Sequence, residues 1–131
     1  MGEANRVDEE LAHLRVNYPH LEYRPDGQWV RIPSYPVPPD VWKQSSVELC
    51  FLIPQQIPGQ APYGFYVRPS LVLLSDAVVS NYAFPAPTAF GDDWGKFSWQ
   101  LSEWTPTSTV VGGTNMVNFA RSVADRLREG A

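Results

Sequence analysis

Cysteine and histidine are scarce in this chain of 131 residues. Cys50 is the only cysteine, which excludes an internal disulfide and any cysteine-rich metal site. The two histidines, His13 and His20, both lie near the N-terminus, and so few ligands argue against a zinc site. We therefore expect no bound metal ion.

An excess of positive charge and long apolar runs are also missing. The chain has ten Lys and Arg against fourteen Asp and Glu, a net charge of −4, and its basic residues are scattered. Proteins that bind phosphate backbones gather such residues in patches, so we expect no nucleic-acid partner. No apolar run approaches the roughly 20 residues that span a bilayer. No basic-then-apolar leader opens the sequence, and we expect a cytoplasmic protein without membrane contact.

Sequence motifs of several common enzyme classes are absent as well. The chain has no phosphate loop, dinucleotide fingerprint, zinc-protease helix or Gly-x-Ser-x-Gly turn, so we expect no cofactor. A Ser-His-Asp triad would require His13 or His20 to reach a serine in a loop. The adjacent carboxylates of Asp92 and Asp93 are typical of solvated turn residues.

Proline and aromatic residues are abundant instead. Thirteen prolines are about twice the usual share, and they exclude a helical bundle through the middle of the chain. The length fits one domain over residues 1–131. Apolar positions at helical spacing predict helices at the two ends, and alternating apolar residues predict strands between them. The expected elements are a helix over 3–16, strands over 29–32, 47–53 and 64–68, an irregular segment over 75–110 and a helix over 114–128.

This layout predicts an α+β fold in which two helices pack on one face of a small antiparallel meander. Val7, Leu11 and Leu14 would form the apolar face of the first helix. The corresponding face of the last helix would be Met116, Ala120, Val123 and Leu127, with Thr114 as the N-cap.

Cys50 lies in the clearest of these strands. Val47, Leu49, Phe51 and Ile53 alternate onto one face, and Cys50 falls on the other face beside Glu48. A reactive thiolate needs an electropositive and partly exposed setting, which these neighbours do not supply. We therefore expect Cys50 to be an inert packing residue.

Several short motifs occur in the order found in one known family. A Tyr-Pro-x-x-x-Pro turn before a strand has its counterpart in 57–62, with Ile57 in place of the tyrosine. By these motifs the chain resembles ubiquitin-conjugating enzymes of the UBC-like fold, and more closely a bacterial branch found beside ubiquitin-like proteins. The further matching segments are Ser80-Asn81-Tyr82 for the family's His-Pro-Asn, Trp104-Thr105-Pro106 for its Trp-Ser-Pro, and 29–36 and 97–99 for the bacterial branch.

The catalytic cysteine of the family has no counterpart here. The family keeps its thioester nucleophile in the interval that corresponds to Asn81–Trp104, and this interval contains no cysteine. In the family a usual spacing separates the catalytic cysteine from the tryptophan of Trp-Ser-Pro. The same spacing, counted back from Trp104, falls on Lys96, and Ser98 supplies a hydroxyl two residues later. Matching Asn81 to the family's asparagine implies a longer loop inserted over 83–95.

The first interpretation is an enzyme that remains an acyl carrier. Ser98 would accept the C-terminal glycine of a ubiquitin-like protein as an oxyester, because a hydroxyl is nucleophilic once a base removes its proton. The resemblance gives Asn81 the role of a side-chain donor to the oxyanion. The candidate bases are Asp92, Asp93 and Glu103, and the supporting residues are Trp104 and Lys96, the latter as an electrostatic aid or an acceptor of self-modification.

Two alternatives remain open. The chain could be a catalytically inert variant that binds the ubiquitin-like protein or its activating enzyme as a scaffold. Alternatively the resemblance is accidental, and the chain is a small-ligand or protein-binding α+β module in which Ser98 is an ordinary loop serine.

The resemblance also implies partners. These are a ubiquitin-like protein, an activating enzyme of the adenylating type, and a deconjugating peptidase from the same antiviral defence operon. Candidate contacts are Arg6 and Arg15 on the first helix and the aromatic side chains of Trp94 and Trp99. A solvated helix face explains the arginines equally well, and core packing is the alternative for tryptophans.

Overall fold

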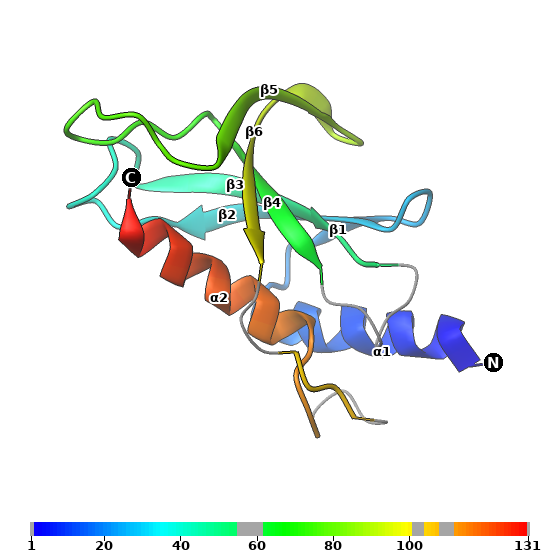
Figure 1. Cartoon of the computed structure of the whole chain (residues 1–131). Coiled ribbons are helices and arrows are strands. Elements are labelled where there is room, and N and C mark those ends of the chain that lie inside the picture. The colour runs from blue at the N-terminus through cyan, green and yellow to red at the C-terminus, as the bar shows by residue number, and fades with distance from the viewer. Residues whose placement is uncertain (1, 55–61, 101–103, 108–111, 131) are drawn as a thin grey trace.

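The structure, a computed structural model, describes residues 2–54, 62–100, 104–107 and 112–130. Within these residues a six-stranded antiparallel sheet has the order β1-β2-β3-β4-β6-β5. Helices α1 and α2 both lie on one side of the sheet, and the β5–β6 hairpin curls away on the other side (Figure 1). The elements are α1 (Gly2–Asn17), β1 (Glu22–Arg24), β2 (Trp29–Pro36), β3 (Ser46–Leu52), β4 (Tyr63–Arg68), β5 (Tyr82–Thr88), β6 (Gly91–Gln100) and α2 (Met116–Glu129). The α+β prediction is confirmed.

Both helices use the apolar faces that the sequence predicts. In α1, Leu11 and Leu14 are buried and Val7 packs against the core. The four apolar residues named for α2 are all fully buried. The N-cap differs from the expected Thr114: Asn115 accepts a hydrogen bond from the Asn118 N–H, and the Asn118 side chain accepts one from the Asn115 N–H. This reciprocal pair satisfies two of the free N–H groups of the helix start.

Two buried polar side chains tie α2 to the rest of the core. The Tyr35 hydroxyl in β2 donates to the Ala120 carbonyl at 2.6 Å. The Trp42 indole donates to the Leu127 carbonyl at 2.8 Å and meets the Phe97 ring edge to face. These bonds fix α2 along its length, because each satisfies a buried donor that would otherwise be costly.

The segment 75–110 is more regular than the sequence predicts, and the expectation of a long irregular loop there is wrong for much of its length. Strands β5 and β6 occupy most of its described part, and they take in nearly all of the expected insertion over 83–95. Pro85 and Pro87 obscured the pattern in β5. Proline is tolerated there because β5 is the edge strand of the sheet.

No helix within the described ranges combines the length and the apolar composition that crossing a membrane requires.

Candidate functional site

The structure brings Asn81 and Ser98 together at one end of the β5–β6 hairpin. The Ser98 backbone N–H donates to the Asn81 carbonyl at 2.8 Å, next to the register pair of Tyr82 and Phe97. Both side chains are exposed. Asn81 lies in the turn just before β5 and Ser98 lies in β6, so the structure brings their backbones together although 16 residues of the chain lie between them.

Asn81 is held in an uncommon backbone conformation. Its φ of 55° lies in the left-handed region, which asparagine enters more readily than most residues. The preceding carbonyl, of Ser80, accepts a hydrogen bond of 2.9 Å from the Arg126 guanidinium. Arg126 is itself buried and lies 4.9 Å above the Phe97 ring centroid. The α2 helix thereby fixes the entry to β5 through one arginine.

Ser98 lies at a bulge in the sheet. Tyr63 pairs with Gln100, but Phe65 pairs with Phe97, so Gly64 faces both Ser98 and Trp99. Gly64 has a φ of 73°, and a Cβ there would lie 2.7 Å from the Phe97 carbonyl oxygen, so no other residue fits without strain. Bulges interrupt pairing and re-aim side chains, and they occur often beside active sites.

Lys96 lies in β6 two residues before Ser98, just ahead of the bulge. The side chain is half-buried, and its ammonium lies 5.7 Å from the Tyr66 ring centroid. Tyr66 in β4 is its direct register partner, and Ala83 in β5 is the partner on the other side.

Asp93 does not approach Ser98. Its carboxylate pairs with Arg68 at 3.1 Å, and it lies five positions from Ser98 along the strand, roughly 16 Å. Asp92 is exposed one residue farther away, and Glu103 lies outside the described residues. Of the carboxylates considered as bases, neither described one reaches the Ser98 hydroxyl.

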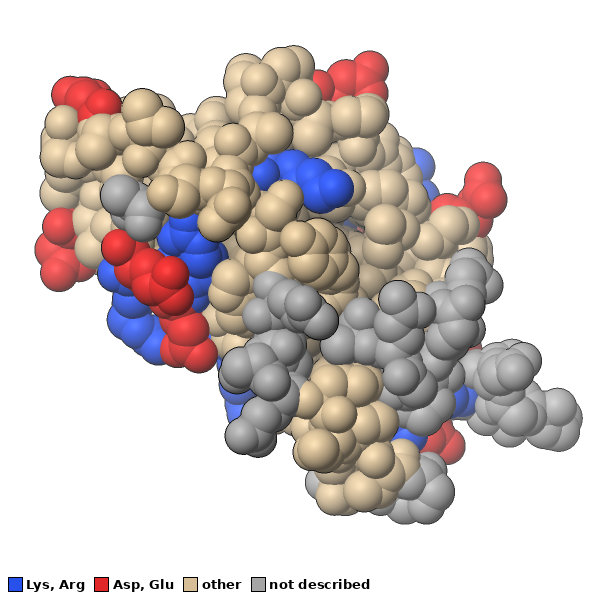
Figure 2. Space-filling view, viewed as in Figure 1, with Lys and Arg blue, Asp and Glu red and all other residues tan. Residues whose placement is uncertain are grey.

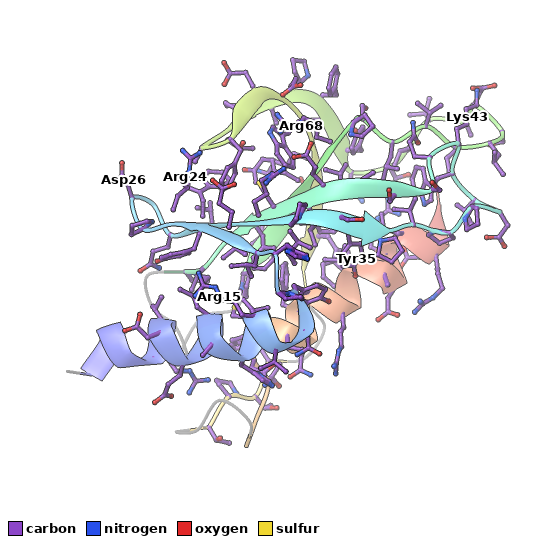
Figure 3. The ribbon with its side chains drawn as sticks, turned by 180° about the vertical axis from the view of Figure 1, so that it is seen from behind. Arg15, Arg24, Asp26, Tyr35, Lys43 and Arg68 are labelled. Carbon is purple, nitrogen blue, oxygen red and sulfur yellow. The ribbon has the colours of Figure 1, made fainter. Side chains whose placement is uncertain are left out.

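Asp93 belongs instead to a row of alternating charges across the outer face of the sheet. Hydrogen bonds with Arg68 and Arg31 hold the pKa of Glu48 below its ordinary value, and the bonds to Glu48 and Asp93 raise the pKa of Arg68. Figure 3 shows Arg24 and Arg68 on the side of the sheet away from the helices. The row runs Glu22, Arg31, Glu48, Arg68, Asp93.

The tryptophan side chains pack against other residues of the chain. Trp94 is fully buried on the outer face, beneath the Arg68 guanidinium at 4.5 Å. Trp99 is half-buried between Phe65 and Phe119, and Trp104 packs against the core. Trp94 therefore offers no exposed surface for a partner contact, whereas Trp99 keeps part of its side chain exposed. Trp29 lies on the outer face against Tyr66.

The two arginines of α1 have different surroundings. Arg6 is buried, its Nε pairs with Glu10 at 3.0 Å, and its Nη1 donates to the Thr107 carbonyl at 2.8 Å. Because Arg6 is only 7% exposed, it is committed to internal contacts. Arg15 is exposed. Acidic and basic side chains of the described residues are mixed over the face in Figure 2, without one continuous basic area.

Cys50 is fully buried on the outer face of β3. Burial raises the pKa of its thiol to about 12, against smaller opposing effects of Thr88 and Arg68. A thiol with this pKa is protonated at neutral pH and is a poor nucleophile. The prediction that Cys50 is a packing residue agrees with its surroundings.

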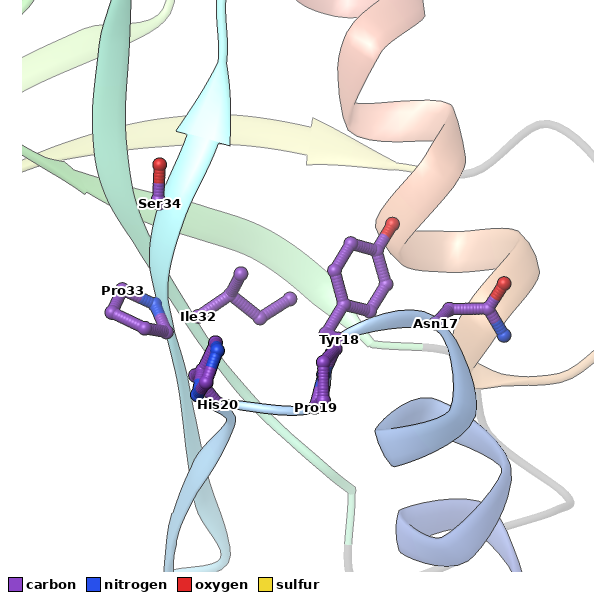
Figure 4. Close-up of a pocket in the computed structure, with 7 residues that line it drawn as sticks. All are labelled: Asn17, Tyr18, Pro19, His20, Ile32, Pro33 and Ser34. Atoms are coloured by element: carbon purple, nitrogen blue, oxygen red, sulfur yellow. The ribbon is translucent and has the colours of Figure 1, made fainter.

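A small hollow lies apart from the Ser98 region, where α1 ends against β2 (Figure 4). Its volume is about 140 Å³. It is lined by Asn17, Tyr18, Pro19, His20, Ile32, Pro33 and Ser34. Among the described residues no cluster of three or more His, Cys, Asp or Glu could hold a metal ion.

Sequence reasoning missed Gly64 and Arg126 as positioning residues. An isolated glycine within a strand is a signal for a bulge, which could have identified Gly64. Arg126 follows Phe119 and Val123 at helical spacing on a buried stripe, whereas the sequence suggested only a role at the C-terminal end of the helix dipole.

Comparison with known proteins gives one match. The family model described as prokaryotic E2 family E matches residues 7–125. No curated protein and no solved structure matches the chain.

Proposed function

The chain belongs to prokaryotic E2 family E, and from this premise we propose that it carries the C-terminal glycine of a ubiquitin-like protein as an ester on Ser98. Membership in an E2-like family implies, in general terms, interaction with a ubiquitin-like protein and an activating enzyme. The ester in place of a thioester, and the residues that form it, are the new elements of the proposal.

The observation that carries the proposal is the contrast between Cys50 and Ser98. The only cysteine is buried with a thiol pKa raised to about 12, so it is a poor thioester nucleophile. Ser98 is an exposed hydroxyl at a bulge, and its backbone N–H is bonded to Asn81. Acyl transfer needs a nucleophile beside an amide donor, and the pairing of the two backbones supports giving that role to the Asn81 side chain.

The chemistry would proceed in two stages. The Ser98 Oγ attacks the carbonyl carbon of the glycine thioester on the activating enzyme, and the enzyme's thiolate leaves. The Asn81 amide would donate to the oxyanion during this step, where such a donor is worth roughly a hundredfold in rate. An acceptor amine then attacks the ester, and Ser98 leaves as an alcohol. The second stage is slower than from a thioester, because an alkoxide is a poorer leaving group than a thiolate.

Partner binding would use the surface of α1. Arg15 is exposed there, while Arg6 is committed to Glu10 and Thr107, so Arg15 is the better candidate contact for the activating enzyme. A deconjugating peptidase would complete the pathway by cleaving the glycine linkage. We expect Trp94 and Trp99 to support the sheet rather than the partner, because both are packed.

A direct test is incubation of the chain with ATP, its activating enzyme and its ubiquitin-like protein, followed by intact-protein mass measurement. The proposal predicts an adduct on the wild type and on Cys50→Ala, and none on Ser98→Ala. Asn81→Ala should slow adduct formation without reducing binding of the ubiquitin-like protein. An adduct that requires Cys50 would refute the proposal.

A scaffold without chemistry is the second candidate. It is favoured by the Asp93 carboxylate, which is engaged by Arg68 and is therefore not free to act as a base for Ser98. For this candidate the same incubation gives measurable binding and no adduct.

A further inference from the structure

We infer that Lys96 is the base that accepts the proton of the Ser98 hydroxyl. This inference rests on the proposed role of Ser98 as the acyl carrier, and it assigns the proton acceptor that the carboxylates do not supply. Serine and lysine form such pairs in enzymes of unrelated folds.

The first support is the spacing of the two side chains. Lys96 and Ser98 are two residues apart in β6, about 7 Å along the strand. The four-carbon stem of a lysine can span such a gap by rotation about its side-chain bonds. The backbone between them is fixed, since Phe97 pairs with both Phe65 and Tyr82.

The second support is the open path between them over Gly64. The Lys96 Cε lies 3.8 Å from the position that a Cβ on Gly64 would occupy. Gly64 is also the residue that faces Ser98 across the bulge. Because Gly64 has no side chain, nothing on β4 at this position separates the lysine stem from the serine.

The third support is the protonation state of the other titratable groups around Lys96. Tyr66 in β4 lies beneath it, Cys50 in β3 is the register partner of Tyr66, and β5 contributes the uncharged Ala83. Burial raises the pKa of Tyr66 and of Cys50, so both are protonated at neutral pH and cannot accept a proton. The nearby charge of Arg68 is paired with Glu48 and Asp93.

The histidines do not compete for this role. His13 is in α1, on the helix side of the sheet, and His20 is in the turn before β1, which three strands separate from β6 in the sheet order. Within the described ranges, Lys96 is therefore the group with both the chemistry and the position of a base.

The transfer step balances as follows. The neutral Lys96 amine takes the proton from Ser98 Oγ while Oγ bonds to the glycine carbonyl carbon. The carbon–sulfur bond breaks, and the activating enzyme's thiolate leaves with the electron pair. In the second stage the acceptor amine bonds to the same carbon and loses one proton to solvent, the bond from that carbon to Ser98 Oγ breaks, and the Lys96 ammonium returns its proton to the departing Ser98 oxygen. Protonating that oxygen offsets its weakness as a leaving group.

The test compares Lys96→Met and Lys96→Arg with the wild type. Methionine keeps the apolar stem over Gly64 and Tyr66, and arginine keeps the charge but cannot act as a base. The probe is a synthetic peptide ending in Gly-Gly, supplied as its mercaptoethanesulfonate thioester, and the readout is the rate of ester formation on Ser98 from pH 6 to 10. The matched variant Glu103→Gln tests the remaining carboxylate.

In the wild type the rate should rise with pH and then level off as one group loses its proton. In both Lys96 variants the rate should lose this dependence on pH and should be about a hundredfold or more lower at the plateau. Glu103→Gln should keep the pH dependence of the wild type. An unchanged profile in Lys96→Met, or a lost one in Glu103→Gln, would overturn the inference. So would a hydroxylamine-stable amide on Lys96 in place of the ester.

The two claims fail separately. If Ser98→Ala still forms the ester, the proposed function itself is wrong. If Ser98→Ala abolishes the ester and Lys96→Met leaves the rate and its pH profile intact, Ser98 stands and only the role of Lys96 is refuted. No ester on the wild-type chain with this probe would overturn the role of Lys96, and the proposed function would still be decided by the incubation with the complete ubiquitin-like protein.

Discussion

The Glu10 carboxylate in α1 accepts a hydrogen bond of 3.0 Å from the Met116 backbone N–H at the start of α2, although the two are 106 positions apart in the sequence. The other carboxylate oxygen pairs with Arg6 at 3.0 Å, and Arg6 reaches the Thr107 carbonyl. Glu10 is fully buried, so a single carboxylate joins α1, the segment before α2 and the start of α2 itself. A negative charge at this place also complements the helix dipole.

Removal of this carboxylate should strongly destabilise the fold. Glu10→Ala leaves Arg6 buried without its charge partner, and breaking a buried pair in this way costs about 3 kcal/mol or more in the free energy of unfolding. The measurement is urea unfolding at pH 7. The neighbouring exposed Glu9→Ala is the matched control, and it should change the unfolding free energy by less than about 0.5 kcal/mol. Equal effects of the two substitutions would contradict the account.

Arg126 should matter both for stability and for the Asn81 backbone. Arg126→Met removes the hydrogen bonds to the Ser80 and Gly130 carbonyls, which we expect to cost about 2 kcal/mol. Because the Ser80 carbonyl anchors the entry to β5, ester formation on Ser98 should also slow in the folded variant. Arg128→Met, on the exposed side of the same helix, should change neither quantity. Normal ester formation by a folded Arg126→Met would show that this anchor is not needed.

The row of charges on the outer face should make the free energy of unfolding depend on pH through the Glu48 carboxylate. Its pKa is lowered in the folded protein from an ordinary value of 4.5, so its contribution to stability is present above pH 4.5 and is lost as pH falls through the lower folded pKa. Unfolding free energies of the wild type and Glu48→Gln should therefore differ more at pH 7 than at pH 3. A difference that stays constant over this range would exclude the role of Glu48.

Cys50 should be unreactive in the folded protein. Its thiol is fully buried and its pKa is raised to about 12, so alkylation by iodoacetamide at pH 7.5 should be slow until urea unfolds the chain. Mass measurement of the alkylated chain follows the reaction. Rapid alkylation without urea would mean that the thiol is accessible, and Cys50 would then be a candidate for the thioester nucleophile.

Much of the fold could be predicted from local patterns. The helices were predicted from apolar residues at helical spacing, and β3 from alternation at Val47, Leu49 and Phe51. The β5–β6 hairpin was not predicted, because the edge strand contains prolines and β6 begins with Gly and Asp. Its pairing depends on contacts with β4, which no local pattern reveals.

The site could be predicted only in part. The family motifs indicated Asn81 and Ser98, and the structure brings their backbones together. The same reasoning left Arg6 on a solvated helix face and Asp93 as a candidate base. The partners that bury or engage these two side chains, Thr107 and Arg68, lie far from them in sequence. Spacing within one element cannot show such partners.

The measurement that tests the central claim most directly is the chemical stability of the adduct formed with the activating enzyme and the ubiquitin-like protein. The intact mass is recorded before and after a thiol reductant, and then after alkaline hydroxylamine. An oxyester on Ser98 survives the reductant, is cleaved by alkaline hydroxylamine, and is absent from Ser98→Ala. An adduct removed by the reductant, or one that persists in Ser98→Ala, would contradict the account.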